Sequence, residues 1–271
     1  LSGNGVIGNA NVGDSKALTN VSGLTLGNGS NGGLAANYTL SGGTQVLSVT
    51  KRPVTISGSR IYDGTQTVSN SSISTINNRV GGQTLNITGS GSVGSAAAGS
   101  GKTIIIGTLA LADNSGSASN YTLNGGTHIF SVTKRPITLA ATRVYDGTNV
   151  LDGTNVDTTF TYSNVVGTEI LSQTGTGTVS NSNVGSGKSV SVVDLTLVDG
   201  SGAASNYNLT SSTLNITARP LSLSGSRVYD ATTTASSSDL STITNLVGSE
   251  TLTLSGNGVV GNANVGDSKA L

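Results

Sequence analysis

The strongest constraint on the fold is a repeat of about 84 residues. The phrase LSGNGVIGNANVGDSKAL opens the chain at residue 1, and it returns from residue 254 with Val260 in place of Ile7. Inside the chain KRPVTISGSRIYDGTQT, KRPITLAATRVYDGTNV and ARPLSLSGSRVYDATTT carry Pro53, Pro136 and Pro220, which are 83 and 84 residues apart. The chain is therefore slightly more than three copies of one structural unit.

Two further phrases recur in the same register, one around N-Y-T-L and one beginning V-G-x-(Q/E). With the K-R-P phrase as the boundary, the sequence predicts part of a repeat at 1–50, complete repeats at 51–133 and 134–217, and part of a repeat at 218–271. The first segment is the C-terminal part of a repeat, and the last is an N-terminal part. Periodicity sets the length of the unit but not its first residue, so a cut at residue 1 would serve equally well.

Short alternating runs predict strands. TLNIT at 84–88, SVSVV at 189–193 and TLTLS at 251–255 have the period of a half-buried strand, and no stretch of similar length has a helical period. Gly is 39 of 271 residues, and it clusters with Asn, Asp and Ser in turn-like segments. The expected fold is all-β: tandem β-sandwich repeats with six or seven short strands each, arranged end to end as an elongated rod.

Apolar positions on either side of K-R-P lie an odd number of residues apart. Val49, Val132 and Ile216 precede Val54, Ile137 and Leu221 by five residues each. Because side chains alternate along a strand, this offset predicts that one strand finishes one core and the next begins another. Proline restricts itself and the residue before it, so we expect a short, stiff linker.

The Tyr-Asp-Gly phrase predicts a structural turn rather than a binding site. With Pro53, Pro136 and Pro220, its residues form the expected structural motif: Tyr62, Asp63, Gly64, Tyr145, Asp146, Gly147, Tyr229 and Asp230. Ala231 replaces the glycine in the third copy, so we expect no obligatory positive φ and a type I-like turn. The arginines two residues before each tyrosine, Arg60, Arg143 and Arg227, are expected to pack over a tyrosine that caps the core.

Composition argues against several function classes. Thirteen basic and thirteen acidic residues balance, so neither nucleic acid nor an anionic membrane is an expected partner. Cysteine is absent, and no apolar run is long enough for membrane insertion. The single histidine, His128, falls in an apolar slot that Val46 and Leu214 occupy in the sister repeats. We expect no enzyme, no catalytic residue and no cofactor.

Three modifications or ligands remain open but disfavoured. Calcium would need Asp63, Asp146 and Asp230, or Asp113 and Asp199, yet no run of alternating aspartates occurs. A Lys to Asn isopeptide bond from Lys102 or Lys188 to Asn120 or Asn206 would need a buried carboxylate, and no recurring Glu is expected to supply it. Asn-x-Ser/Thr triplets permit glycosylation at Asn37, Asn86, Asn120, Asn208 and Asn215.

The four ordered phrases, K-R-P-(I/V)-T-(I/L), R-(I/V)-Y-D-G-T, V-G-x-x-T-L and N-Y-T-L, resemble the YDG repeats and the related MBG, or mostly bacterial Ig-like, repeats. The resemblance covers essentially the whole chain, with Ala231 and Ala218 as the departures. It implies tandem extracellular β-domains of large bacterial surface proteins, often filamentous-haemagglutinin-like adhesins that act in attachment or biofilm matrix.

The resulting expectation is a non-enzymatic stalk on the bacterial cell surface or in a secreted matrix, which projects a distal binding domain. Its partners would be neighbouring repeats of the same chain. In the alternative, the repeats themselves bind a host or matrix carbohydrate, or associate with other copies of the array. Incomplete repeats expose edge strands, so head-to-tail pairing between molecules is also open.

Overall fold

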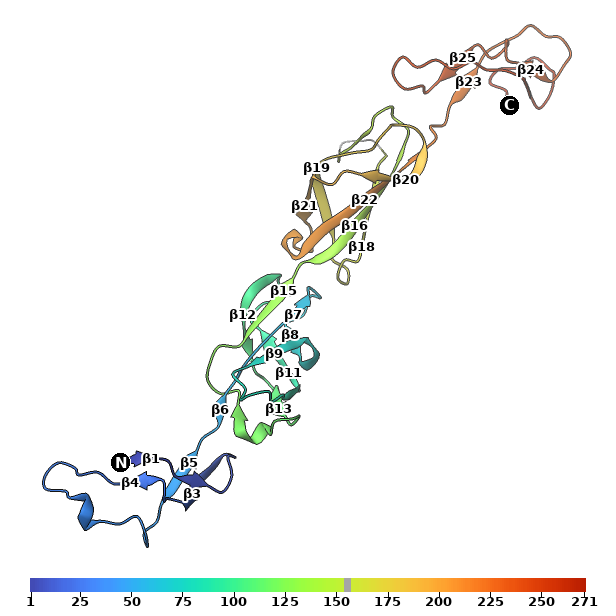
Figure 1. The fold of residues 1–271 in the computed structure, drawn as a ribbon. Helices are drawn as coiled ribbons and strands as arrows, with labels where there is room; N and C mark the ends of the chain where they lie inside the picture. Colours follow the sequence, from blue (N-terminus) through green and yellow to red (C-terminus); the bar gives the residue numbers. More distant parts are fainter. Residues whose placement is uncertain (154–156) are drawn as a thin grey trace. The chain divides into compact units, whose positions relative to one another are not determined.

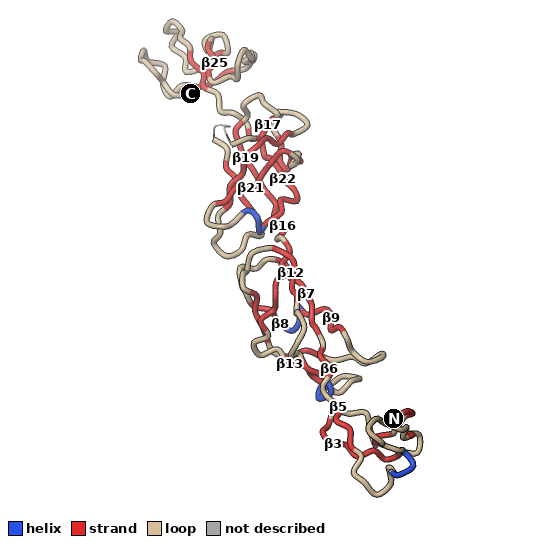
Figure 2. The backbone as a smooth tube through the Cα atoms, turned by 90° about the vertical axis from the view of Figure 1, so that its left-hand side faces the viewer, coloured by secondary structure: helices blue, strands red, loops and turns tan. Residues whose placement is uncertain are grey.

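The computed structural model describes residues 1–153 and 157–271, and the described part is all-β, with short 3-10 turns and no α-helix (Figures 1 and 2). The chain forms two compact units, Leu1–Lys134 and Arg135–Leu271. Each unit contains one long set of paired strands and one smaller set. The expected fold class of all-β repeats is confirmed.

The first unit begins with short strands. These are β1 (Ser2–Gly3), β2 (Val6–Ile7), β3 (Gly13–Asn20), β4 (Leu24–Thr25), the 3-10 turn η1 (Ala35–Asn37) and β5 (Val46–Val49). Strand β3 pairs antiparallel with β2 and β5, and β1 pairs with β4. This segment buries few side chains.

The larger part of the first unit is a six-stranded sheet in the order β8-β11-β12-β15-β7-β9. Its elements are β6 (Arg52–Pro53), β7 (Thr55–Ile61), β8 (Thr67–Ser69), η2 (Asn70–Ser72), β9 (Ile73–Asn77), β10 (Asn86–Thr88), β11 (Ser90–Val93), β12 (Gly99–Ile105), β13 (Ala110–Ala112), η3 (Ala118–Asn120), β14 (Tyr121–Thr122) and β15 (Ile129–Thr133). Strands β10 and β13 pair separately, as do β14 and β6. The first long strand, β7, runs parallel to the last, β15.

The second unit opens with seven strands in two sheets, ordered β18-β16-β22-β20 and β17-β19-β21. Its elements are β16 (Arg135–Val144), β17 (Val150–Leu151), β18 (Thr159–Ser163), β19 (Leu171–Thr178), β20 (Gly185–Val190), β21 (Asp194–Asp199), η4 (Ala204–Asn206) and β22 (Tyr207–Thr217). Four shorter strands follow: β23 (Ser222–Ser224), β24 (Thr234–Ser236), β25 (Thr242–Thr244) and β26 (Asn257–Val259).

The two sheets of residues 135–217 enclose an aliphatic core. Its buried members are Leu139, Ala141, Leu151, Val179, Val190, Leu195, Leu214 and Ile216. They come from both sheets, as in a β-sandwich, and Leu151 and Leu214 are fully buried. Burying a side chain of this size stabilises the fold by about 2 kcal/mol, so the sandwich holds its own core.

Strand alternation changes phase where one repeat gives way to the next. Phe130 and Val132 are buried along β15, whereas Ile137, Leu139 and Ala141 are buried along β16. Even positions face a core before Lys134 and odd positions face a core after it. At this boundary the odd offset found in the sequence corresponds to a real change of the buried face. The expectation is wrong for Leu221, which is 40% exposed.

The register of the long strands corrects the expected place of His128. Ile129 pairs with Ser57 in the first unit, and Thr213 pairs with the equivalent Ala140 in the second. His128 therefore corresponds to Ser212 and not to Leu214. Both residues are buried, so this slot accepts polar side chains.

Candidate functional site

The Tyr-Asp-Gly loop of residues 135–217 is held together by an aspartate. One carboxylate oxygen of Asp146 accepts hydrogen bonds from the backbone N–H and the hydroxyl of Thr148, both at 3.0 Å. Arg143 Nη2 lies 3.3 Å from the same oxygen. A turn of this kind closes through the side chain of its own aspartate, and the arginine then neutralises the charge.

The same arrangement recurs in the other two copies. Thr65 donates twice to Asp63 at 2.9 Å, and Thr232 donates twice to Asp230 at 3.0 Å. Arg60 pairs with Asp63, and Arg227 lies 3.4 Å from Asp230. The hydrogen bonds from Thr232 lower the pKa of Asp230. The recurring structural motif is thus Arg-x-x-Asp-x-Thr.

Arg143 is the most deeply buried charge of the chain's described part, with 1% of its surface exposed. Its two terminal nitrogens donate to the backbone carbonyls of Val150 and Thr148. The equivalent Arg60 donates to the carbonyl of Thr65, and burial lowers its pKa. The guanidinium nitrogens hold the loop through these donations, and the expected packing of the guanidinium over the tyrosine ring stays a prediction.

The expected turn type is wrong. Gly64 and Gly147 have φ of 78° and 79°, and Ala231 adopts φ 61° at the same place. Type I turns need negative φ at both central residues, so all three loops belong to another class. The alanine accepts a left-handed conformation that costs roughly 1 kcal/mol, because the surrounding hydrogen bonds still close the loop.

The three tyrosines of the motif differ in exposure. Tyr62 is buried, Tyr145 is half-buried against the core of its repeat, and Tyr229 is 60% exposed. Tyr145 also donates its hydroxyl to Glu250. That hydrogen bond is the largest cause that raises the pKa of Tyr145, followed by burial and by the charges of Glu250 and Asp146.

The K-R-P phrase forms a second polar clamp. Arg135 donates from Nε to the carbonyl of Asn164 at 2.6 Å and from Nη2 to its side-chain oxygen at 2.7 Å. The amide of Asn164 donates in turn to the carbonyl of Pro136 at 2.8 Å. Arginine, asparagine and proline therefore close a ring that ties the start of β16 to the end of β18.

The clamp recurs as Arg52, Asn78 and Pro53, and as Arg219, Asn245 and Pro220. The asparagines adopt φ of 68°, 64° and 71° at positions 78, 164 and 245. Sequence reasoning missed these asparagines. The available signal was an Asn that follows each proline by 25 to 28 residues. Asn is, after glycine, among the residues that best tolerate a positive φ.

The tyrosine of N-Y-T-L closes the opposite loop. Tyr207 accepts a hydrogen bond from the N–H of Val166 at 3.0 Å and donates to Glu169 at 2.6 Å. Tyr121 contacts Val80 and Gln83 in the same way. Glu169, Gln83 and Glu250 hold one position of the repeat, so the expectation that no Glu recurs is wrong.

The recurring lysine is used inside its own loop. Lys188 donates to the side-chain oxygen of Asn181 at 2.6 Å, and Lys16 and Lys269 contact Asn9 and Asn262 equivalently. Lys188 thus binds an asparagine close to it in sequence. The Asn206 that an isopeptide bond would require is not its partner in this structure.

The aspartates considered as calcium ligands are distributed over separate loops. Asp113 and Asp199 each accept a hydrogen bond from a 3-10 turn, at 2.6 Å from Ala118 and 2.7 Å from Ala204. In residues 1–153 and 157–271, no three His, Asp or Glu side chains converge in a way that could hold a metal ion. No helix in these residues has the length and apolar character needed to span a membrane.

His128 has a structural place. Its Nδ1 accepts a hydrogen bond from the N–H of Ile56 at 3.1 Å, and its Nε2 lies 2.9 Å from the carbonyl of Leu123. This pattern fits the tautomer with the proton on Nε2. The side chain joins β7 to the loop before β15.

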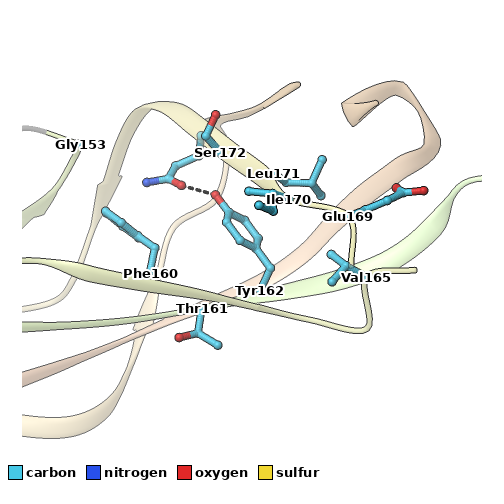
Figure 3. A pocket seen from close by; sticks show the side chains of 10 residues that line it. Gly153, Phe160, Thr161, Tyr162, Val165, Glu169, Ile170, Leu171 and Ser172 are labelled. Carbon is cyan, nitrogen blue, oxygen red and sulfur yellow. Dashed lines mark hydrogen bonds between the residues drawn. The ribbon is translucent and has the colours of Figure 1, made fainter. Parts of the chain in front are cut away.

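A groove of about 560 Å³ lies beside strand β18 of the second unit. In Figure 3 the rings of Phe160 and Tyr162 stand on one side of this strand, while Thr161 points to the other. Tyr162 donates its hydroxyl to Gln173, and burial raises its pKa to about 12. Glu169 and Ile170 complete one wall.

The aromatic groove is specific to one repeat. Tyr162 pairs with Leu139, and the equivalent pairs in the other copies are Ile76 with Ile56 and Ile243 with Leu223. Tyr162 is also the one tyrosine of seven that lies outside the Tyr-Asp-Gly and N-Y-T-L phrases.

Comparison with known proteins gives one family. The model of the YDG domain matches residues 48–128, 132–215 and 213–271. No curated protein and no solved structure matches the chain. Because the matched segments cover well over half of the sequence in three tandem copies, the chain belongs to the YDG domain family.

Proposed function

We propose that this chain is a non-enzymatic structural spacer of a large extracellular bacterial adhesin, where its repeats project a distal binding domain for attachment or for biofilm matrix. The observation that carries the proposal is that the recurring arginine, aspartate and lysine side chains hold loops of the chain itself. Arg143 and Asp146 close one loop, Arg135 holds Asn164, and Lys188 holds Asn181. Charged side chains whose polar atoms already bind loop groups favour a structural role for the repeats over an enzymatic one.

The topology supports the same role. In each complete repeat the first and last long strands run parallel, so the chain enters at one end and leaves at the other. Strand β22 has 11 residues and spans about 36 Å at roughly 3.3 Å per residue. Each further repeat would then add a similar length.

A length series tests the spacer. Chains with two, three and four copies of residues 135–217 would be compared by small-angle scattering. A spacer predicts that the maximum dimension grows linearly, by about 36 Å per copy. Growth with the cube root of the mass would mean that the copies collapse into a globule, and it would overturn the proposal.

The second candidate function is carbohydrate binding, which the groove at Phe160 and Tyr162 favours. Sugar rings stack on aromatic faces, and Gln173 and Glu169 would supply polar partners at the rim. A glycan array with the whole chain would test this candidate, with Tyr162→Ala as the variant and Ile76→Ala, at the equivalent position of the repeat without the aromatics, as the control. Binding that the first change removes and the second spares would favour the candidate over a plain spacer.

A further inference from the structure

Within the second unit, the Tyr-Asp-Gly loop of one repeat lies against a loop of the next. The hydroxyl of Tyr145 donates to Oε1 of Glu250, and Nη1 of Arg219 donates to the carbonyl of Tyr145 at 3.4 Å. A Cβ added to Gly147 would lie 2.9 Å from Cγ1 of Val247. The glycine therefore allows the Val-Gly-Ser-Glu loop at 247–250 to approach the backbone closely.

The first unit shows a second contact between consecutive repeats. The side-chain oxygen of Asn120 accepts a hydrogen bond from the N–H of Val12 at 2.8 Å, and its amide donates to Asn11 at 3.0 Å. Asn11 and Val12 belong to the loop that Lys16 closes. Asn120 ends the 3-10 turn before the N-Y-T-L tyrosine.

We propose that these two contacts, each of which lies within one unit, are the halves of one joint, through which the Tyr-Asp-Gly loop and the lysine loop of a repeat bind the next copy of the repeat in that unit. The inference rests on the proposed spacer function and assigns the motif a role in it. The partner is a second copy of this same unit. Its V-G-x-(E/Q) loop accepts the tyrosine hydroxyl, and its N-Y-T-L asparagine accepts the lysine loop.

The acceptor of the joint also belongs to the fold of its own repeat. Oε2 of Glu169 accepts the hydroxyl of Tyr207 from the same repeat, while Oε1 of the equivalent Glu250 accepts Tyr145 from the repeat before. A carboxylate or a side-chain amide offers an oxygen with two lone pairs or more, so either can serve both tyrosines. In each of the three copies this position, Gln83, Glu169 or Glu250, accepts one tyrosine hydroxyl.

Distance measurements between paired spin labels test the joint in the whole chain. The protein has no cysteine, so Thr196→Cys and Thr242→Cys place one label on exposed positions of each repeat in the second unit. The joint predicts a narrow distance distribution that becomes roughly twofold wider in Tyr145→Phe and in Glu250→Ala. Glu250→Gln keeps an acceptor oxygen and should retain the narrow distribution.

Tyr162→Phe is the matched control, because it removes a bonded tyrosine hydroxyl that lies within one repeat. Unchanged widths in Tyr145→Phe and Glu250→Ala would overturn the joint, and so would equal broadening in the control. The length series tests the spacer separately, because the maximum dimension can grow with each copy even when the connections between repeats are loose.

Labels at Thr25→Cys and Thr103→Cys test the other half in the first unit. Asn120→Ala should widen that distribution by a similar factor, because it removes both hydrogen bonds to the lysine loop. Circular dichroism would verify that the complete repeat remains folded. A folded Asn120→Ala chain with the original width would overturn this half of the joint.

Discussion

At the residue scale, the repeat depends on charged side chains that hold backbone loops. Arg143 combines near-complete burial with hydrogen bonds to two carbonyls and an ion pair to Asp146. Its Nε has no partner among the described residues, and neither has that of Arg60. Leaving this Nε unpaired costs free energy, and the hydrogen bonds that the terminal nitrogens donate to the loop offset that cost.

Replacing Arg143 should destabilise its repeat. Arg143→Met leaves two carbonyls and a carboxylate without their donor, and a hydrogen bond to a charged group contributes about 2 kcal/mol. We expect Arg143→Met to lower the free energy of unfolding in urea by about 3 kcal/mol or more. Arg143→Lys should lower it by less, because a lysine keeps the charge but lacks the planar fork of donors. Lys51→Met, at an exposed site, is the control. A loss in Arg143→Met no larger than in this control would contradict the clamp.

The tyrosine of the joint should make the contact sensitive to alkali. The hydrogen bond to Glu250, then burial, then the charges of Glu250 and Asp146 raise the pKa of Tyr145, while Arg219 lies at its carbonyl. A raised pKa means that the contact is complete below the ordinary tyrosine value of about 10 and is lost as pH rises through the raised value.

Tyrosinate absorbance measures this titration as the difference between the chain and Tyr145→Phe. Glu250→Gln removes the carboxylate and should move the titration of Tyr145 to lower pH. A titration that does not move in this variant would contradict the assigned cause.

Residue types explain how much of this was predictable. The Tyr-Asp-Gly phrase predicts a turn, and Asp63, Asp146 and Asp230 each accept the local hydrogen bond that closes one. The left-handed conformation of Ala231 could not be predicted, because propensity alone argues against it and only the network of Arg227 and Thr232 supports it. The partners of the K-R-P arginines were missed because Asn78, Asn164 and Asn245 lie a full strand pair away in sequence.

At the element scale, long parallel strands are joined by side chains at their ends. The Arg135 and Asn164 clamp ties β16 to the end of β18, and His128 ties the loop before β15 to β7. Alternation of apolar residues predicted strands and their buried faces. It could not predict the parallel pairing of first and last strands, because that pairing depends on contacts some 70 residues apart.

Two changes at Asn164 separate conformation from hydrogen bonding. Asn164→Gly tolerates the positive φ but removes the side-chain hydrogen bonds to Arg135 and Pro136. Asn164→Ala removes these hydrogen bonds and also tolerates the positive φ poorly. We expect losses of about 2 kcal/mol for glycine and about 3 kcal/mol for alanine in thermal unfolding. Equal losses would mean that the left-handed backbone carries no strain.

The equivalent residues His128, just before β15, and Ser212, in β22, should respond to replacement with opposite signs. His128→Ala leaves the N–H of Ile56 and the carbonyl of Leu123 without partners and should cost about 2 kcal/mol. Ser212 has a buried hydroxyl with no partner among the described residues, so Ser212→Ala should cost nothing or stabilise slightly. Calorimetry would measure the thermal stability of both variants. A loss of stability in Ser212→Ala would contradict the prediction, because it would mean that the hydroxyl makes a hydrogen bond.

At the scale of the whole molecule, the two complete repeats, 51–133 and 134–217, each bury their own set of apolar side chains and close their own loops. The period in the sequence revealed the unit, since one supersecondary pattern recurs every 83 or 84 residues. The joint was not visible in the sequence, because Tyr145 and Glu250 come from phrases in different repeats and gain their meaning only when two copies meet.

Small-angle scattering of the 271-residue chain, recorded with and without a chelator, is the first measurement to make. The proposed spacer predicts an elongated particle. We expect the same scattering curve in both conditions, because the loop aspartates bind threonines and arginines of their own repeats. A compact particle, or a shape that changes when divalent ions are removed, would contradict these predictions.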